Sequence, residues 1–288
     1  MINKVAIGTA QFGYDYGIAN KEGKIKSSEI INILKYVKKN KIKYLDTSNA
    51  YGKSEKEIGN FYYKTGFKFK VITKYSKCFG TVDNQFKKTI ENLGYKPSII
   101  LAHQSKDYLN KNFNNELFNI KKKNPKIKIG ASVYNIKEFK RILSFRKPDV
   151  INVPLNILDQ EFDNKNFIET IKKKKIKVQV RSIFLQGIFF LKLNLLQKKL
   201  PLLKNAVGKI YDLKNKNKKS INDLLINWIK SKYWIDKIII GCDNIDQLKQ
   251  NLRCFNKVIN IKLNQELDNI KFNLKKNLNK ANKWKIKK

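Results

Sequence analysis

The sequence predicts a single (β/α)8 TIM barrel, in one domain that spans residues 1–288. Eight short runs rich in apolar and β-branched residues recur along the 288-residue chain. Amphipathic stretches lie between these runs, and no linker or low-complexity segment divides the sequence. Strands that pack on helices outside and on one another inside are apolar on both faces, so strict alternation is not expected. Strand and helix alternating eight times is the pattern of this barrel.

The expected strands follow one another along the whole chain, at residues 4–9, 43–48, 70–74, 98–103, 127–132, 149–154, 178–182 and 237–241. Apolar residues at helical spacing predict covering helices at 27–41, 84–94 and 135–145. The longest gap, 183–236, leaves room for a loop and two helices, with Ser220 as the N-cap of the last. Residues from about 262 to 288 are expected to form a Lys-rich helix or tail.

A doubly wound open sheet is the competing fold. Such a sheet that binds a dinucleotide has a glycine-rich turn directly after its first strand. The corresponding segment here, "GTAQFGYDYG" at 8–17, does not fit that glycine spacing. The barrel is therefore the better prediction.

The composition is strongly basic, with 62 Lys and Arg against 23 Asp and Glu and a net charge of +39. The basic residues spread along the whole chain, which favours a solvated surface over a nucleic-acid-binding face. Non-specific affinity for polyanions, centred on the C-terminal stretch, is the alternative. The sequence shows no apolar run long enough to cross a bilayer, no secretory signal and no metal-binding cysteine spacing. We expect a cytoplasmic protein without a metal, a specific nucleic-acid partner or a membrane-inserted segment.

Polar residues stand where consecutive strands end. Asp46 ends the second strand, Lys74 the third and His103 the fourth, while Tyr51 lies in the loop after the second. Each has a structural explanation: a turn cap, one lysine among many, a packed histidine or tyrosine. Barrel active sites form at the carboxyl ends of the strands, and consecutive strands are neighbours. The combination therefore predicts one site at that rim.

The four residue types suit carbonyl reduction. A tyrosine with a pKa near 10 is a weak proton donor, and a lysine ammonium beside it lowers that pKa. A carboxylate keeps the lysine charged, and a histidine can hydrogen-bond a substrate oxygen. No side chain supplies a hydride, so a nicotinamide cofactor is implied.

The segment "LDTSNAYGKSEKEIG" (45–59), the strand "VITK" (71–74) and "ILAHQ" (100–104) together resemble the aldo-keto reductases. The resemblance extends from "IGTAQFG" near the start to "IIIGCDNIDQLKQNL" near residue 252. It implies that Tyr51 is the general acid/base, that Lys74 and Asp46 tune it, and that His103 orients the carbonyl.

The same resemblance implies an extended NADP(H) across the barrel mouth. The nicotinamide end is expected at Gly8, Thr9, Ser132 and Asn152. The middle of the cofactor is expected along Arg181, Ser182, Phe184, Gln186 and Gly187. The adenosine end is expected at Gly241, Asp243, Gln247, Gln250 and Asn251, where a helix N-terminus favours anions.

Five positions depart from the family pattern, three of them near the nicotinamide and two near the 2′-phosphate. Val133 replaces an asparagine that often follows the serine of the fifth strand, and Asn152 is one methylene shorter than the usual glutamine. Arg181 replaces an aromatic residue that stacks on the nicotinamide; its planar guanidinium could stack as well, or bind an anionic substrate. Gly241 and Gln247 stand where basic residues often hold the 2′-phosphate. The resemblance still favours NADPH, with NADH as the alternative.

"VRSIFLQG" (180–187) is similar to a subgroup linked to surface-polysaccharide and spore-coat biosynthesis, which implies a sugar-like carbonyl substrate. A cofactor-binding regulatory or scaffold protein with little turnover is the alternative function, because the family includes channel β subunits. The sequence does not determine the substrate's identity, the physiological direction or the oligomeric state.

Overall fold

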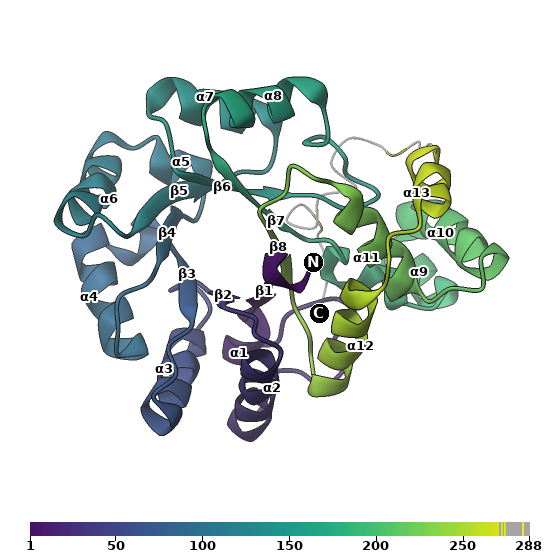
Figure 1. Cartoon of the computed structure of the whole chain (residues 1–288), viewed down its shortest axis with the longest axis horizontal. Helices are drawn as coiled ribbons and strands as arrows, with labels where there is room; N and C mark the ends of the chain where they lie inside the picture. The colour runs from purple at the N-terminus through teal and green to yellow at the C-terminus, as the bar shows by residue number, and fades with distance from the viewer. Residues whose placement is uncertain (271, 273, 275–283, 285–288) are drawn as a thin grey trace.

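The computed structural model describes residues 1–270, 272, 274 and 284. Eight parallel strands close into a barrel in chain order, as Figure 1 shows. All eight predicted strands are confirmed, and with them the (β/α)8 fold. Their bounds are β1 Val5–Gly8, β2 Tyr44–Asp46, β3 Lys70–Tyr75, β4 Ile99–Ala102, β5 Lys128–Ser132, β6 Val150–Pro154, β7 Lys177–Arg181 and β8 Lys237–Ile240.

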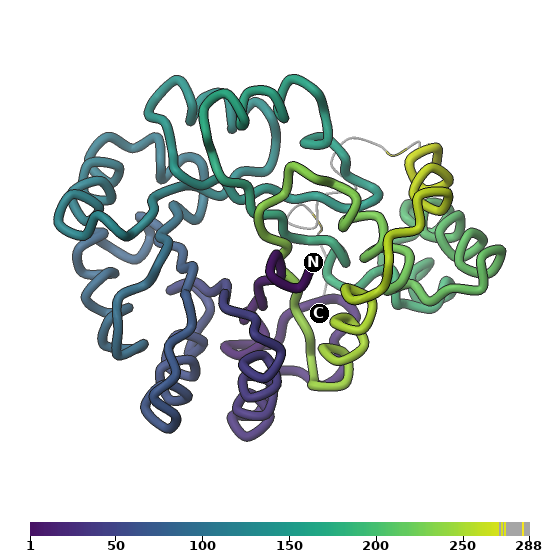
Figure 2. The backbone as a smooth tube through the Cα atoms, in the orientation of Figure 1, coloured from purple at the N-terminus to yellow at the C-terminus, as the bar shows by residue number. Residues whose placement is uncertain are grey.

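Helices surround the strands, and the tube in Figure 2 shows how the chain returns outside the barrel after each strand. The α-helices are α1 Ala10–Gly13, α2 Ser27–Lys39, α3 Ser54–Thr65, α4 Val82–Leu93, α5 Ser105–Tyr108, α6 Lys111–Lys123, α7 Ile136–Phe145, α8 Lys165–Lys173, α9 Leu193–Lys199, α10 Lys204–Lys216, α11 Ile221–Ser231, α12 Ile245–Asn256 and α13 Ile261–Asp268. Short 3-10 turns are η1 Ile2–Lys4, η2 Lys77–Phe79, η3 Leu185–Phe190 and η4 Pro201–Leu203.

The predicted covering helices correspond to α2, α4 and α7. Local sequence sets their ends: the Thr81 hydroxyl caps α4 by accepting from the Asn84 amide, and Gly94 ends that helix with a φ of 78°. A left-handed φ of this kind is easiest for glycine. Asn135 caps α7 in the same way, accepting from the Glu138 amide.

The gap after β7 holds three α-helices, α9 to α11. The prediction of two helices in this gap is therefore wrong. The segment 193–216 breaks at Pro201, which divides what would be one long helix into α9 and α10. Ser220 does cap α11, in a capping box with Asp223. Of the expected tail at 262–288, α13 covers the beginning, and most of the remainder lies outside the described residues.

Side chains of each strand alternate between the helices and the barrel interior. The outward residues join one large core under the helices. The inward residues of the lower barrel form a second, smaller apolar cluster of Ala6, Ile72, Ile99, Leu101, Val150 and Ile239. Two residues further along the five strands of this cluster stand Gly8, Lys74, His103, Asn152 and Gly241, and the remaining strands β2, β5 and β7 end in Asp46, Ser132 and Arg181. Because side chains alternate along each strand, these residues point toward the barrel mouth at the carboxyl ends of the strands.

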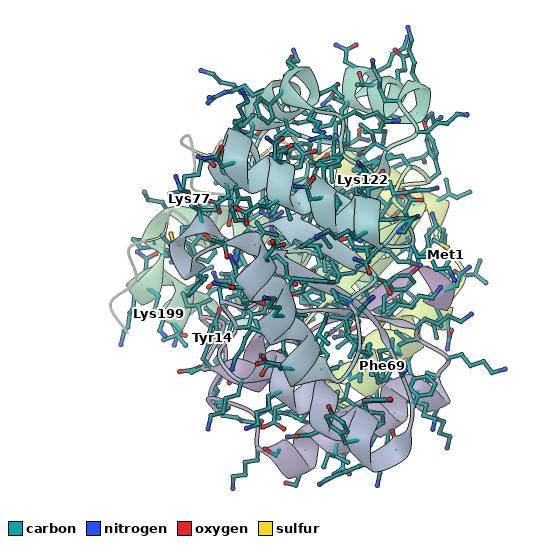
Figure 3. All side chains as sticks on the ribbon, turned by 90° about the vertical axis from the view of Figure 1, so that its left-hand side faces the viewer. Met1, Tyr14, Phe69, Lys77, Lys122 and Lys199 are labelled. Carbon is teal, nitrogen blue, oxygen red and sulfur yellow. The ribbon has the colours of Figure 1, made fainter. Side chains whose placement is uncertain are left out.

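Most lysines lie on the outside. In Figure 3 the labelled Lys77, Lys122 and Lys199 lie at the surface, and all three are exposed. Within the part of the chain that the structure describes, Lys74 and Lys230 are the buried lysines, at 2% and 3% exposure. No described helix is both long and apolar enough to span a bilayer.

Candidate active site

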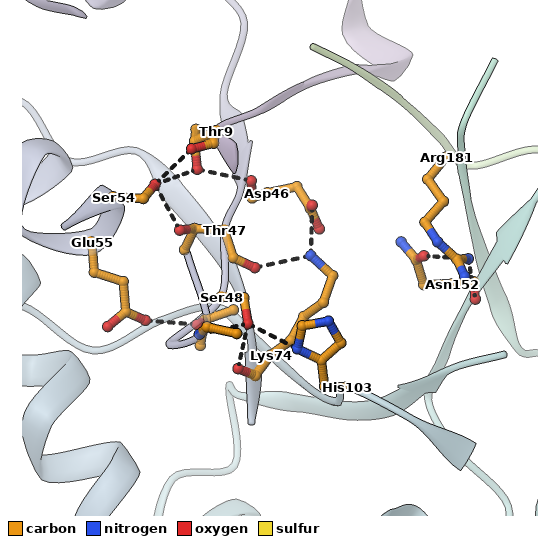
Figure 4. Close-up of polar contacts among 12 residues, drawn as sticks. Thr9, Asp46, Thr47, Ser48, Ser54, Glu55, Lys74, His103, Asn152 and Arg181 are labelled. Carbon is orange, nitrogen blue, oxygen red and sulfur yellow. Dashed lines mark hydrogen bonds and ion pairs between the residues drawn. The ribbon is translucent and has the colours of Figure 1, made fainter. Parts of the chain in front are cut away.

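The four predicted side chains meet at one place, and Figure 4 labels three of them, Asp46, Lys74 and His103. Lys74 Nζ lies 2.6 Å from Asp46 Oδ2, and it also donates to the Thr47 carbonyl at 2.9 Å. The same ammonium lies 5.0 Å from the centre of the Tyr51 ring. The rings of Tyr51 and His103 meet edge-on, with centroids 6.1 Å apart. Barrel closure thus brings residues from three strands and one loop into a single cluster.

The turn that carries Tyr51 is pinned to the loop after β1. Thr9 Oγ1 donates to the Asp46 carbonyl at 3.0 Å, and Ser54 Oγ lies 2.7 Å from Thr9 Oγ1. A Cβ added at Gly13 would lie 1.6 Å from the Tyr51 carbonyl oxygen. Because no side chain fits there, Gly13 permits the close approach that fixes the tyrosine turn.

Burial governs the proton affinities of the ion pair. It raises the pKa of Asp46 and lowers the pKa of Lys74, while the charge of each partner opposes the other's shift. Lys74 is 2% exposed and Asp46 5%. Asp46 Oδ1 has no hydrogen-bond partner among the described residues. The pair is therefore a dry, closely contacted group at the base of the site.

Burial, then the Asp46 carboxylate, raises the pKa of Tyr51 well above 10.0, and Arg181 opposes the rise. This direction is opposite to the lowering expected from a neighbouring lysine, because loss of solvent disfavours the phenolate more strongly. The phenol consequently holds its proton at neutral pH. A phenol in this state can donate a hydrogen bond.

His103 is neutral in this environment. Burial, and after it the charges of Lys74 and Arg181, lowers its pKa from 6.5 to about 4. Its Nδ1 lies 3.1 Å from Ser48 Oγ, and that hydroxyl lies 3.0 Å from the Lys74 carbonyl. Ser48 has one hydrogen for these two neighbours, so it is coupled to the tautomer of His103.

A second wall of the site is built by β5, β6 and β7, and Figure 4 shows it across the barrel mouth from Lys74. Arg181 donates to Asn152 Oδ1 at 3.0 Å and to the Val133 carbonyl at 3.1 Å. Its guanidinium lies 4.6 Å from the centre of the Tyr134 ring. Asn152 is fully buried, and its Nδ2 has no partner among the described atoms. Arg181 therefore contacts both of the neighbouring positions that depart from the family pattern.

The loop after β7 has unusual backbone geometry. Ser182, Leu185 and Gln186 have φ values of 66°, 46° and 54°, a region that non-glycine residues seldom adopt. The Gln186 carbonyl accepts from the Ala19 amide at 3.4 Å, so two loops meet beside the site. Strain of this kind concentrates at functional sites.

One cavity of about 600 Å³ connects these features. Its lining includes the four clustered residues Asp46, Tyr51, Lys74 and His103. It also includes all of the predicted cofactor positions except Asn152, which lies beneath Arg181. The sequence prediction missed several lining residues. Aromatic and polar residues in the loops that follow β1, β5 and β6 were the available signal: Tyr14, Tyr16, Tyr134, Asn156 and Asp159.

The cavity fits a nicotinamide dinucleotide. Its volume lies within the usual range for cofactor sites. A Cβ at Gly241 would lie 2.9 Å from Gln11 Nε2, and one at Gly8 would lie 3.3 Å from Ile239. Larger residues at these two positions would therefore narrow the cavity. The unpartnered Nδ2 of Asn152 is a hydrogen-bond donor, but Asn152 is fully buried beneath Arg181 and does not line the cavity. Among the residues the structure describes, no group of His, Cys, Asp and Glu could hold a metal ion.

The profile of the Aldo/keto reductase family matches residues 4–271, and the chain belongs to that family. It is accordingly an NAD(P)H-dependent oxidoreductase that acts on small carbonyl compounds. A search of curated proteins finds no significant match.

Solved structures agree at the level of the fold. An aldo-keto reductase of Bacillus halodurans in its holo form has a TM-score of 0.71 at 15% identity, covering 92% of this chain and 90% of that one. The glycerol dehydrogenase of Gluconobacter oxydans gives 0.70 at 15%, with the same coverages of 92% and 90%. An aldo/keto reductase of Brucella melitensis gives 0.65 at 15%, covering 92% and 93%.

Proposed function

We propose that this protein reduces an aldehyde or ketone to an alcohol with Tyr51 as the proton donor. The observation that carries the proposal is a protonated phenol beside a buried Lys74–Asp46 pair and a neutral histidine, all in one cavity. The phenol and the histidine are in the protonation states that donation to a carbonyl oxygen requires.

The residues divide the work. A nicotinamide, when bound, supplies the hydride to the carbonyl carbon. Tyr51 gives its proton to the oxygen, which would otherwise become an alkoxide. The Lys74 ammonium stabilises the phenolate that remains, and Asp46 keeps that ammonium charged. His103 hydrogen-bonds the carbonyl oxygen and orients it toward Tyr51.

The cofactor residues remain those implied by the family resemblance. Gly8, Thr9, Ser132 and Asn152 would hold the nicotinamide end, and the loop 181–187 the middle. The substrate we propose is sugar-like, and the polar wall of Tyr14, Tyr16 and Asn156 supports this, because hydroxyls and amides match a polyhydroxylated molecule. We further propose a cytoplasmic location.

The test is a screen of sugar aldehydes and keto-sugars with either reduced cofactor, in which turnover is measured as the loss of cofactor fluorescence. Turnover of any of these supports the proposal. Tight cofactor binding with no turnover over a broad carbonyl panel would favour the regulatory or scaffold alternative. Full turnover by Tyr51→Phe on a confirmed substrate would show that the proton donor is misassigned.

A further inference from the structure

The two ends of the cavity differ in charge. Lys74 and Arg181 are the cations among its described lining residues, and both belong to the catalytic end. The far end lies against the start of α12, where the lining consists of neutral groups and one carboxylate: Asn222, Gly241, Asp243, Gln247, Gln250 and Asn251. A dinucleotide with its nicotinamide at Tyr51 must place its other nucleotide at this far end.

Further carboxylates surround Asp243. Its Oδ1 accepts from Gln11 Nε2 at 3.3 Å, and its Oδ2 from Gln247 Nε2 at 3.3 Å. Burial raises its pKa, and so do the negative charges of Glu22 and Asp15. In a chain with 62 basic and 23 acidic residues, the charges that act on Asp243 are thus those of other carboxylates.

The start of α12 was expected to attract a phosphate, but the protein's own groups already occupy it. The Ile245 amide donates to Glu29 Oε1 at 2.9 Å, and the Gln247 amide donates to Asn244 Oδ1 at 2.9 Å. Just before the helix, the Asp243 amide donates to Gln247 Oε1 at 2.9 Å. A carboxylate thus sits where the helix dipole would favour an anion.

The lysines near this end do not restore a phosphate site. Lys249 Nζ is 3.0 Å from Asp246, to which it is paired. Lys21 and Lys24 share a loop with Glu22, but both are exposed and neither lines the cavity.

We infer that this chain prefers NADH to NADPH, with Asp243 excluding a 2′-phosphate and accepting a hydrogen bond from a 2′-hydroxyl. The inference rests on the proposed function and reverses the cofactor preference that the resemblance implies. A phosphate dianion beside carboxylates, without a lining cation, meets like-charge repulsion and loses solvent. An acidic residue at the ribose is the usual means of selecting the 2′-hydroxyl, and an arginine that of accepting the phosphate.

Titrations of purified protein with NADH and with NADPH, followed by fluorescence at physiological salt, test this directly. At that ionic strength the Debye length is about 8 Å, so the overall positive charge is largely screened. We expect NADH to bind at least about tenfold more tightly, a difference of roughly 1.4 kcal/mol. Equal binding, or tighter binding of NADPH, would overturn the inference. Binding of neither cofactor by folded protein would instead contradict the proposed function.

Three variants localise the effect. Asp243→Asn should tighten NADPH binding by roughly tenfold, and its NADH-to-NADPH affinity ratio should fall accordingly. Glu29→Gln should shift the ratio the same way by a smaller factor, because it weakens the carboxylate cap on α12. Glu91→Gln, an exposed carboxylate on α4, removes the same charge elsewhere and should leave the ratio unchanged. A ratio that does not respond to Asp243→Asn would show that Asp243 is not the selecting group.

Discussion

The barrel interior has two layers with different roles. The lower layer is the apolar cluster, and the upper layer consists of the polar residues that follow at the carboxyl ends of the strands. Ile72 and Leu101 lie in the lower, apolar cluster, and both are fully buried. Lys74 and His103 follow on the same inward face and form the site. The lower layer gains stability by removing apolar surface from water. The upper layer buries charge at a cost, which is expected where a fold maintains chemistry rather than stability.

The largest expected effect is a loss of turnover rate, without a loss of stability, when Tyr51 in the site is changed. Tyr51→Phe removes the proposed proton donor but keeps the ring, so kcat should fall by roughly 10²–10⁴ with little change in unfolding temperature. Turnover and thermal unfolding would be measured on the same samples. Tyr63→Phe, at an exposed tyrosine of α3 outside the cavity lining, is the control and should keep full activity.

The ion pair tests the energetic side of the comparison. Asp46→Asn leaves Lys74 buried without its partner and should cost about 3–5 kcal/mol in urea unfolding. The double variant Asp46→Leu with Lys74→Met replaces the buried ion pair by apolar side chains like those of the lower layer. It should recover stability to within about 1 kcal/mol of the native chain while remaining inactive. If the single variant were as stable as the native chain, the pair would not be the dry group described.

The lower layer should show the reverse behaviour. Leu101→Ala leaves a cavity in the apolar cluster, and we expect a loss of about 2–5 kcal/mol in the free energy of unfolding. At a temperature where the variant is folded, kcat should stay within about threefold of the native value, since no reacting group moves far. A large fall in kcat with unchanged stability would mean that the two layers are not separable.

The pKa of His103 gives the upper layer a pH signature. Its folded value is about 4 and its unfolded value 6.5, so the unfolded chain binds more protons between these limits. The stability linked to this group is complete above pH 6.5 and is lost as the pH falls toward 4, by roughly 3 kcal/mol in total. Unfolding of the native chain and of His103→Gln at several pH values isolates the contribution, because His103 is the sole histidine. Parallel pH profiles for the two proteins would contradict the depressed pKa.

The smallest expected effect concerns Ser48. Ser48→Ala removes the partner of His103 Nδ1 and should cost about 1 kcal/mol. It should also change the balance of the two neutral tautomers, which ¹⁵N NMR reports without overlap for a single histidine. Ser76→Ala removes another buried hydroxyl, one that caps η2, and serves as the control. An unchanged tautomer balance in Ser48→Ala would show that Ser48 does not set it.

The sequence by itself determined the barrel and the core of the site. Strand and helix periods are local properties, so eight strands could be located from eight short runs. Because side chains alternate along a strand, Asp46, Lys74 and His103 at the strand ends had to face the same mouth once the barrel closed. Tyr51 lies in a loop where no period applies; its place five residues after Asp46 made it a candidate, and the family resemblance implied its role as the general acid/base.

Tertiary structure decided the contacts that join distant segments. Glu29 caps a helix that begins 216 residues later, and Arg181 bonds Asn152 and the Val133 carbonyl. A proline divides the helical segment 193–216 into α9 and α10, so the gap after β7 holds three helices where two were expected. The raised pKa of Tyr51 likewise depends on burial that only the closed barrel produces. A local pattern records what each residue favours, whereas desolvation and long-range hydrogen bonds depend on which surfaces meet. For that reason the sequence indicated the kind of reaction, and the fold decided which charges line the cavity.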